Sequence, residues 1–267
     1  MSGDRLGSRE LAELRNRFGG RPMAIAGQVA DLRLMSALQI QSLYFQPSDH
    51  TSALSAARSC RRLLSALTSA RVLVRLERRI GGVHAGSSSW IYALGAVGHR
   101  LLEADGARPR FREPSPLFVD HTLAIAQLVV DVTVATRRGT PEILNVEPEP
   151  RCWRTLAHGV GGEWLKPDLF VAIGNGELEH RWFIEMDRAT AHVPALRRKC
   201  HLYQSYYQTG REQAAHGVFP RVCWIVPDAD RAQRLIKMLD GERGLTQDLF
   251  TVVVEQDAVD LITGARQ

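Results

Sequence analysis

Two stretches of sequence decide the fold of the C-terminal half: KPDLFVAI at residues 166–173 and WFIEMD at residues 182–187. Each combines an apolar run of strand length with acidic residues near one end, Asp168 in the first and Glu185 and Asp187 in the second. Because side chains alternate between the two faces of a strand, Glu185 and Asp187 are expected on the same face. If the two strands are neighbours, Asp168 joins them at one edge of a sheet.

Three carboxylates at one sheet edge form an oxygen-rich site suited to Mg²⁺ or Mn²⁺. Such a metal stabilises charge during phosphodiester cleavage and activates a water. We therefore predict a metal site at Asp168 and Glu185, with Asp187 assisting. The alternative is that these acids are polar strand ends of a purely structural sheet. Three further acids, which fit solvated loops better than a metal site, are Glu147, Glu149 and Glu163.

The residues around these two stretches predict a mixed sheet flanked by helices. Apolar runs of strand length occur at 142–146, 169–173, 182–184, 222–226 and 250–254. Helical patterns occur at 120–136, 194–208 and 230–239. The first of these helices has a predicted inner stripe of Leu123, Ala126, Val130 and Val134. The order of elements is α-β-β-β-α-β-α-β, which indicates an α+β or α/β domain over residues 117–267.

The N-terminal half has a different order of elements. Three helices are predicted at 24–33, 36–45 and 51–69, followed by strands at 72–76 and 90–94. Ser36 is a suitable N-cap for the second helix. The loop at 81–89, GGVHAGSSS, suits a flexible hairpin. This order is typical of a winged helix-turn-helix, whose last helix enters the major groove of DNA.

The third helix carries the predicted DNA contacts. If Ala53, Ala57, Cys60 and Leu64 face the core, serine and arginine side chains lie on the outer face. Those side chains suit phosphates and guanine edges. The candidate DNA-binding residues on the helix and the wing are Ser55, Arg58, Ser59, Arg62, Arg75, Arg78 and Arg79. The alternatives are a solvated helix face beside a polar loop, or a winged helix that contacts only proteins.

Charge is distributed unevenly along the chain. Residues 1–110 contain 16 basic and 8 acidic side chains, whereas residues 111–267 contain 18 basic and 21 acidic ones. A cationic N-terminal half indicates a polyanion as partner. We place a winged-helix domain at 1–105, a linker rich in proline and arginine at 106–116, and the second domain at 117–267.

Composition excludes several classes of protein. Hydrophobic residues make up 45% and charged residues 24%, which is typical of a globular chain. The chain has no run of 18 uncharged apolar residues and no apolar run near its N-terminus, so we expect neither a membrane span nor a secretory signal. The four cysteines form no CxxC pair, which favours reduced thiols in the cytoplasm over a zinc site or disulfides.

The second domain resembles the PD-(D/E)XK nuclease superfamily. Pro167-Asp168 corresponds to the first motif element and Glu185 to the second. The third element departs from the pattern, because position 187 is Asp where the superfamily usually has Lys. The superfamily sometimes relocates this lysine to the following helix, where Lys199 lies. The resemblance therefore implies Asp168, Glu185 and Lys199 as catalytic residues, with Lys199 orienting the water or the leaving oxygen.

Over residues 24–260 the chain resembles the replication-relaxation family of plasmid and integrative-element proteins. The residues that carry this resemblance are WIYALGAVGHRLL at 90–102, His121, WLKPD at 164–168, FIEMDRAT at 183–190, Lys199, Tyr203 and Phe219-Pro220. The family implies a winged-helix reader fused to a nuclease-like domain, with roles in plasmid replication and DNA relaxation. Some mobilisation relaxases look similar and are expected to nick DNA through this fold.

Together these features predict a winged helix-turn-helix followed by a restriction-endonuclease-like mixed sheet. The leading interpretation is a metal-dependent DNA nickase that acts in replication or mobilisation. The alternative is a non-catalytic DNA-binding replication or copy-control regulator with a degenerate nuclease fold, which the departure at Asp187 favours. A third class is an adaptor whose two domains bind proteins. We expect double-stranded DNA as the main partner, with other replication or mobilisation proteins and a homodimer as further options and no membrane.

Overall fold

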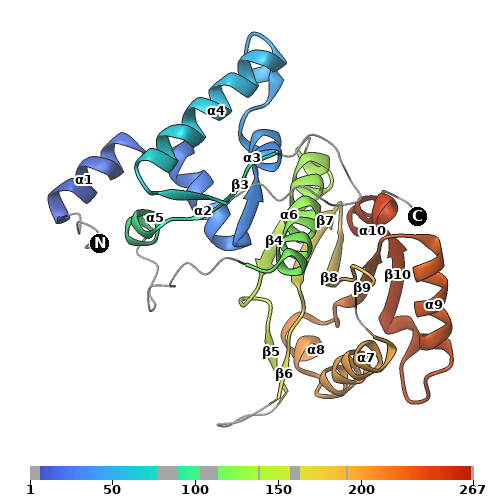
Figure 1. The fold of residues 1–267 in the computed structure, drawn as a ribbon. Helices are drawn as coiled ribbons and strands as arrows, with labels where there is room; N and C mark the ends of the chain where they lie inside the picture. The colour runs from blue at the N-terminus through green and yellow to red at the C-terminus, as the bar shows by residue number, and fades with distance from the viewer. Residues whose placement is uncertain are drawn as a thin grey trace. The chain divides into compact units, whose positions relative to one another are not determined.

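The computed structural model describes residues 7–76, 89–102, 114–137, 139–156, 163–190 and 192–265. It divides into two compact units, Met1–Val130 and Asp131–Gln267. The fold is mixed α+β with a five-stranded mixed sheet in the second unit, which confirms the predicted fold class at that level (Figure 1). Most of the predicted linker at 106–116 lies outside the described residues, so its assignment stays a prediction.

The first unit combines helices with a small antiparallel sheet. Its helices are α1 (Ser8–Arg17), α2 (Arg21–Leu32), α3 (Ala37–Tyr44), η1 (Pro47–Asp49), α4 (Ala53–Ser69), α5 (Ala96–Leu101) and the part of α6 (Pro116–Thr136) up to Val130. Its strands are β1 (Leu34–Ser36), β2 (Leu73–Leu76) and β3 (Ile91–Leu94), in the order β1-β3-β2. The N-cap role of Ser36 is confirmed, because its hydroxyl accepts a hydrogen bond from the backbone N–H of Gln39 at 3.2 Å. The hydropathy pattern of the sequence did not predict α1, β1 or α5.

Helix α4 packs on the unit through one apolar face. Its buried residues are Ala56, Cys60, Leu64 and Leu67. The prediction that Ala53 faces the core is wrong: Ala53 is exposed, because α4 starts at this residue, directly after the N-cap Ser52, whose hydroxyl accepts from Ser55 N–H. The buried stripe therefore begins one turn later than predicted.

Two glycines bring the start of α5 close to the backbone between α4 and β2. A side chain at Gly95 would overlap the backbone carbonyl of Arg71, and one at Gly98 would overlap that of Val72. Gly95 N–H donates to Val72 O at 2.8 Å. These close approaches explain why both positions are glycine within the stretch 90–102.

The second unit is built on a five-stranded sheet in the order β10-β9-β8-β7-β4. These strands are β4 (Glu142–Pro148), β7 (Leu169–Asn175), β8 (Leu178–Met186), β9 (Arg221–Val226) and β10 (Phe250–Val254). The β4, β7 and β8 strands pair antiparallel, whereas β8, β9 and β10 run parallel. A separate two-stranded ribbon joins β5 (Arg154–Thr155) to β6 (Trp164–Leu165), and the pattern did not predict it. Residues 157–162 of this hairpin lie outside the described part.

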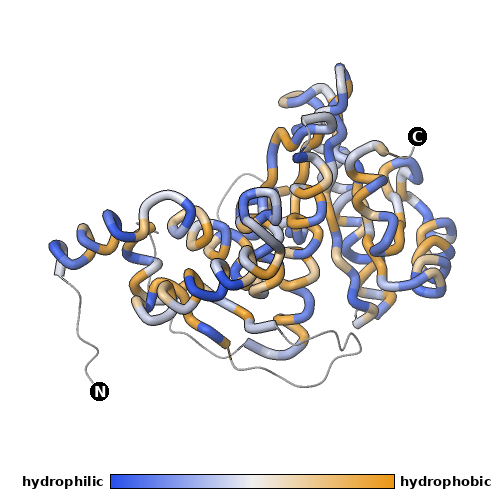
Figure 2. Tube along the Cα trace, turned by 90° about the horizontal axis from the view of Figure 1, so that it is seen from above, coloured by the Kyte–Doolittle hydropathy of each residue, from blue (hydrophilic) through white to orange (hydrophobic). Residues whose placement is uncertain are grey.

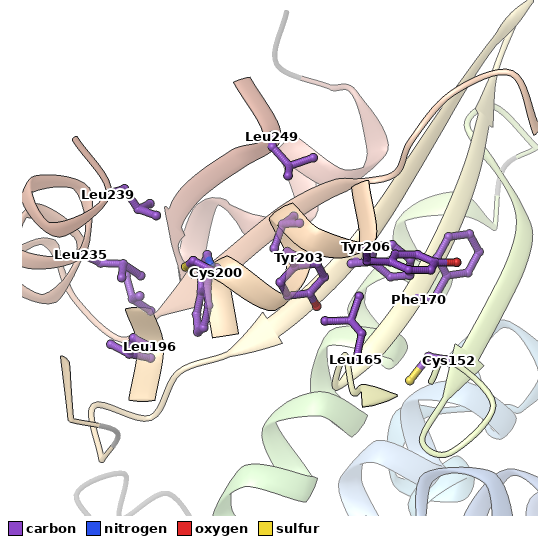
Figure 3. Packing of buried hydrophobic residues seen from close by; sticks show 14 of the residues in the cluster. Cys152, Leu165, Phe170, Leu196, Cys200, Tyr203, Tyr206, Leu235, Leu239 and Leu249 are labelled. Carbon is purple, nitrogen blue, oxygen red and sulfur yellow. The ribbon is translucent and has the colours of Figure 1, made fainter. Parts of the chain in front are cut away.

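Two helices pack with one face of this sheet in a single core cluster (Figure 3). They are α7 (Val193–Gln208), which begins one residue before its predicted start, and α9 (Ala229–Asp240). The alternating hydropathy along α9 in Figure 2 reflects its buried and exposed sides. The remaining elements are α8 (Arg211–His216), η2 (Gln247–Leu249), η3 (Glu255–Asp257) and α10 (Ala258–Thr263).

Helix α6 (Pro116–Thr136) starts four residues before its predicted start and is apolar almost throughout. Of its predicted inner stripe, Ala126 and Val130 are buried, but Val134 is exposed, so the prediction for Val134 is wrong. Among the described residues, α6 is the one helix whose length and composition would let it cross a membrane. A core helix of a globular protein meets the same criteria, which makes this weak evidence for a span.

Candidate functional site

The pairing of β7 with β8 brings two of the predicted acids together. The two strands are antiparallel with Leu169 opposite Ile184, so the start of β7 lies beside the end of β8. Asp168 N–H donates to Ile184 O at 3.1 Å, and Met186 N–H donates to Asp168 Oδ2 at 2.7 Å. Asp168 is thus fixed next to Glu185 by backbone hydrogen bonds.

Lys199 reaches both of these carboxylates from α7. Its Nζ is hydrogen-bonded to Glu185 Oε2 and lies 3.9 Å from Asp168 Oδ1. The side chain of Glu185 is 2% exposed, whereas that of Lys199 is 29% exposed. The structure therefore brings together the three residues that the sequence proposed as catalytic.

Tyr203 completes this group, and sequence reasoning assigned no chemical part to it. Its hydroxyl donates to Glu185 Oε1 at 2.5 Å, and the whole residue is buried. The available signal was its spacing from Lys199, because residues four apart lie on the same face of a helix. Figure 3 shows the Tyr203 ring among the buried apolar side chains of the core cluster. We call Asp168, Glu185, Lys199 and Tyr203 the acid–lysine cluster.

Burial and charge both act on the protons of the acid–lysine cluster. Burial is the largest effect on Glu185 and raises the pKa of its carboxyl to about 8, against the opposing influence of Lys199. Burial alone would lower the pKa of Lys199, but Glu185 and Asp168 outweigh it and raise that pKa above its ordinary value. Lys199 is therefore a permanent cation near neutral pH.

Asp187 does not join the acid–lysine cluster. Its Oδ2 accepts a hydrogen bond from Arg231 Nε at 2.6 Å, and its Oδ1 accepts one from Ala189 N–H at 3.0 Å. Arg231 lies on α9, so the carboxylate of Asp187 ties β8 to that helix. Within the described part of the chain, no group of three or more His, Cys, Asp or Glu residues could hold a metal ion.

A second charged network lies on the strands and helices beside the acid–lysine cluster. Arg154 donates to Glu147 Oε2 at 2.9 Å and to Glu212 Oε1 at 3.1 Å, and its guanidinium lies over the ring of Phe170. Tyr206 donates to Glu212 Oε1 at 2.8 Å. Sequence reasoning gave no part to Arg154. Glu147 is thus held by Arg154, and Glu163 pairs with Arg198 at 3.4 Å.

The candidate DNA-binding residues of the first unit differ in their exposure. Arg58 and Arg62 are exposed on α4, as is Arg61, which the sequence analysis did not propose. Ser55 and Ser59 are only partly exposed, and Ser55 N–H is engaged by the N-cap Ser52.

The predicted wing residues divide between described and undescribed parts of the chain. The Arg75 guanidinium stacks on the Trp90 ring at 3.8 Å from its centroid, which joins β2 to the residue before β3. Arg78 and Arg79 lie outside the described residues, as do residues 81–88 of the predicted hairpin loop.

The model of one protein family matches residues 27–222, and its description is replication-relaxation. This chain belongs to the replication-relaxation family. The match covers α4 and all of the acid–lysine cluster, and it ends at the start of β9. No curated protein and no solved structure matched the chain. Membership of the replication-relaxation family indicates a role in the replication of mobile elements.

Proposed function

We propose that this protein binds DNA in plasmid or integrative-element replication or mobilisation and nicks it with the help of Mg²⁺ or Mn²⁺. One observation carries the proposal: Lys199 lies against both Asp168 and Glu185. An ammonium at this place is what a PD-(D/E)XK-like nuclease with a relocated lysine requires.

The topology of the second unit supports a nuclease-like fold. The order β4-β7-β8-α7-β9, preceded by the C-terminal end of α6, follows the α-β-β-β-α-β core of that superfamily, apart from the inserted β5–β6 ribbon and the short helix α8 between α7 and β9. The two acids come from the ends of adjacent antiparallel strands and the lysine from the next helix. The resemblance to the PD-(D/E)XK superfamily implies acids and a lysine at such positions, which supports the proposal.

Asp168 and Glu185 are the residues that would hold the metal. Two carboxylates beside a single cation fit Mg²⁺, which proteins bind through one or two carboxylates while it keeps several waters. The bound ion would stabilise charge on the scissile phosphate and activate a water. Asp187 is held by Arg231, so its predicted assisting role is the least supported part of the site.

The protein's own residues have distinct proposed roles in this site. Lys199 supplies a positive charge beside the phosphate, because its raised pKa keeps it protonated. Tyr203 fixes the orientation of Glu185 through its hydroxyl. In the first unit, α4 presents exposed arginines that we assign to duplex DNA, in the manner of a winged helix.

A second candidate is a non-catalytic DNA-binding replication or copy-control regulator. It is favoured by Glu185, which is buried and has both carboxylate oxygens engaged, one by Tyr203 and one by Lys199. A carboxylate satisfied in this way stabilises the fold without any metal.

A nicking assay on supercoiled plasmid separates the two candidates. We expect nicked circles with Mn²⁺ or Mg²⁺ but not with chelator, and we expect Lys199→Ala to reduce the rate by about 10²–10³-fold, the usual cost of a lost electrostatic stabiliser. Lys199→Arg should also fail, because the larger guanidinium does not fit the same space between two acids. The matched control is Lys237→Ala, since Lys237 is exposed on α9.

Each outcome of the nicking assay leads to one conclusion about the function. If the wild-type protein nicks with neither metal, the regulator is the correct function. If nicking survives Lys199→Ala, the assignment of Lys199 is wrong although the protein is a nuclease. DNA affinity should stay within a few fold in Lys199→Ala, which a gel-shift titration checks.

A further inference from the structure

An exposed aromatic ring lies close to the acid–lysine cluster along the chain. Trp164 is on β6 and is 50% exposed, although tryptophan usually buries most of its surface. It precedes Asp168 by four residues, so the two Cα atoms are at most about 14 Å apart. The Trp164 ring has no role in the proposed nicking reaction.

The ribbon that carries Trp164 is firmly held. Leu165, the next residue, is fully buried in the same apolar cluster as Tyr203 (Figure 3). On the partner strand, Thr155 O accepts a hydrogen bond from Arg211 at 2.5 Å, and Leu156 N–H donates to Glu163 O at 2.9 Å. Burial and hydrogen bonds thus hold the backbone next to Trp164 in place.

Two exposed cations are associated with the residues around Trp164. Lys166 is exposed two residues further along the chain, with its Nζ 4.5 Å from the centroid of the Trp153 ring. Arg198 on α7 is 79% exposed and pairs with Glu163, the residue before Trp164. An exposed aromatic with exposed cations nearby is the composition of a surface that binds single-stranded nucleic acid, in which bases stack and phosphates are neutralised.

We propose that Trp164 stacks on an unpaired base of single-stranded DNA and that Lys166 and Arg198 contact the adjoining phosphates. The inference rests on the proposed function, because it makes this surface the place where the strand to be nicked is held. An unpaired base is required, since the faces of bases inside a duplex are covered by their neighbours. Single-stranded DNA is therefore the substrate class that the second unit recognises.

Fluorescence anisotropy with a labelled oligothymidylate, in the presence of chelator, tests the inference without nicking. We expect Trp164→Ala to weaken binding by about tenfold or more, and Trp164→Phe to stay within a few fold of wild type because it keeps a stacking ring. The matched control is Leu178→Ala, which removes another exposed apolar side chain (57% exposed) at the opposite end of β8 from Glu185. Binding of a duplex of the same length should be unchanged in all three variants.

Three results would overturn the inference. They are a wild-type protein that does not bind the oligonucleotide, a Trp164→Ala variant that binds it as tightly as wild type, and equal losses in Trp164→Ala and Leu178→Ala. A thermal melt of each variant shows whether a loss reflects unfolding, and Trp164→Leu, which keeps an apolar side chain but no stacking ring, decides the question if Trp164→Ala is unstable. If the protein binds single-stranded DNA through Trp164 but never nicks, this inference holds and the nickase function is refuted. If it nicks but does not bind through Trp164, only this inference is refuted.

Discussion

Two buried cysteines lie next to residues of the acid–lysine cluster. The thiol of Cys152 donates to Pro167 O at 3.0 Å, just before Asp168, and Cys200 follows Lys199 on α7. Burial raises the pKa of both thiols to about 12. A thiol is nucleophilic only as the thiolate, so both should be inert at pH 8 in the native protein.

Thiol titration tests this packing at the residue scale. Burial likewise raises the pKa of Cys60 to about 11 and that of Cys223 to about 12. We therefore expect an aromatic disulfide reagent at pH 8 to react slowly with the native chain and to detect all four thiols once denaturant is added. Rapid modification of Cys152 or Cys200 in the native state, located by mass spectrometry, would contradict the closed packing around the acid–lysine cluster.

The sequence predicted some residues of the candidate site much better than others. Asp168 and Glu185 were predicted because strand alternation and a turn before a strand are local properties. Lys199 came from the family resemblance, and the structure places it beside both acids. The partners Tyr203 and Arg231 were not predicted, because they depend on how α7 and α9 pack on the sheet, which no local pattern contains.

At the scale of elements, the end of β8 is tied to α9 by an ion pair. Asp187 and Arg231 have side chains that are 1% and 11% exposed, and their contact is 2.6 Å long. The N-cap Asp228 also accepts from the backbone N–H of Arg231 at 2.7 Å, which fixes the start of α9. Removing one member of a buried pair leaves the other charge without compensation.

We expect Asp187→Ala to lower the free energy of unfolding by about 3–5 kcal/mol, as measured by urea denaturation. The matched control is Glu179→Ala, which breaks a more exposed ion pair with Arg181 on the same strand and should cost about 1 kcal/mol or less. Equal losses of unfolding free energy in the two variants would show that the Asp187–Arg231 pair stabilises the fold no more than an exposed ion pair does. The Asp187 carboxylate would then be available for the metal role predicted from sequence.

Elements with a strong local signal were predicted, and short ones were not. The helices α3, α4 and α7 and the five strands of the large sheet have long apolar patterns, and their predicted positions agree with the structure to within a few residues. The two-residue strands β5 and β6 contain too few residues for any period. The three-residue β1 pairs with β3, a partner far along the chain, so only the folded unit specifies it.

At the scale of the whole molecule, the two units carry opposite net charges. Met1–Val130 contains 17 basic and 10 acidic residues, whereas Asp131–Gln267 contains 17 basic and 19 acidic ones. A unit with excess positive charge attracts duplex DNA before any base is read. The proposed division of labour therefore gives duplex binding to the first unit and the chemistry of the strand to the second.

The salt dependence of duplex binding tests that division. Each arginine that neutralises a phosphate releases condensed counterions, which contributes about 0.9 to the slope of log affinity against log salt concentration. We expect the double variant Arg58→Ala with Arg62→Ala to weaken duplex binding and to reduce that slope by about 2, because both side chains are exposed on α4.

The control is the double variant Arg234→Ala with Lys237→Ala, which removes two exposed cations from α9 and should leave the slope unchanged. Equal reductions in the two double variants would mean that duplex binding is not localised to α4, since the slope counts phosphate contacts wherever they occur.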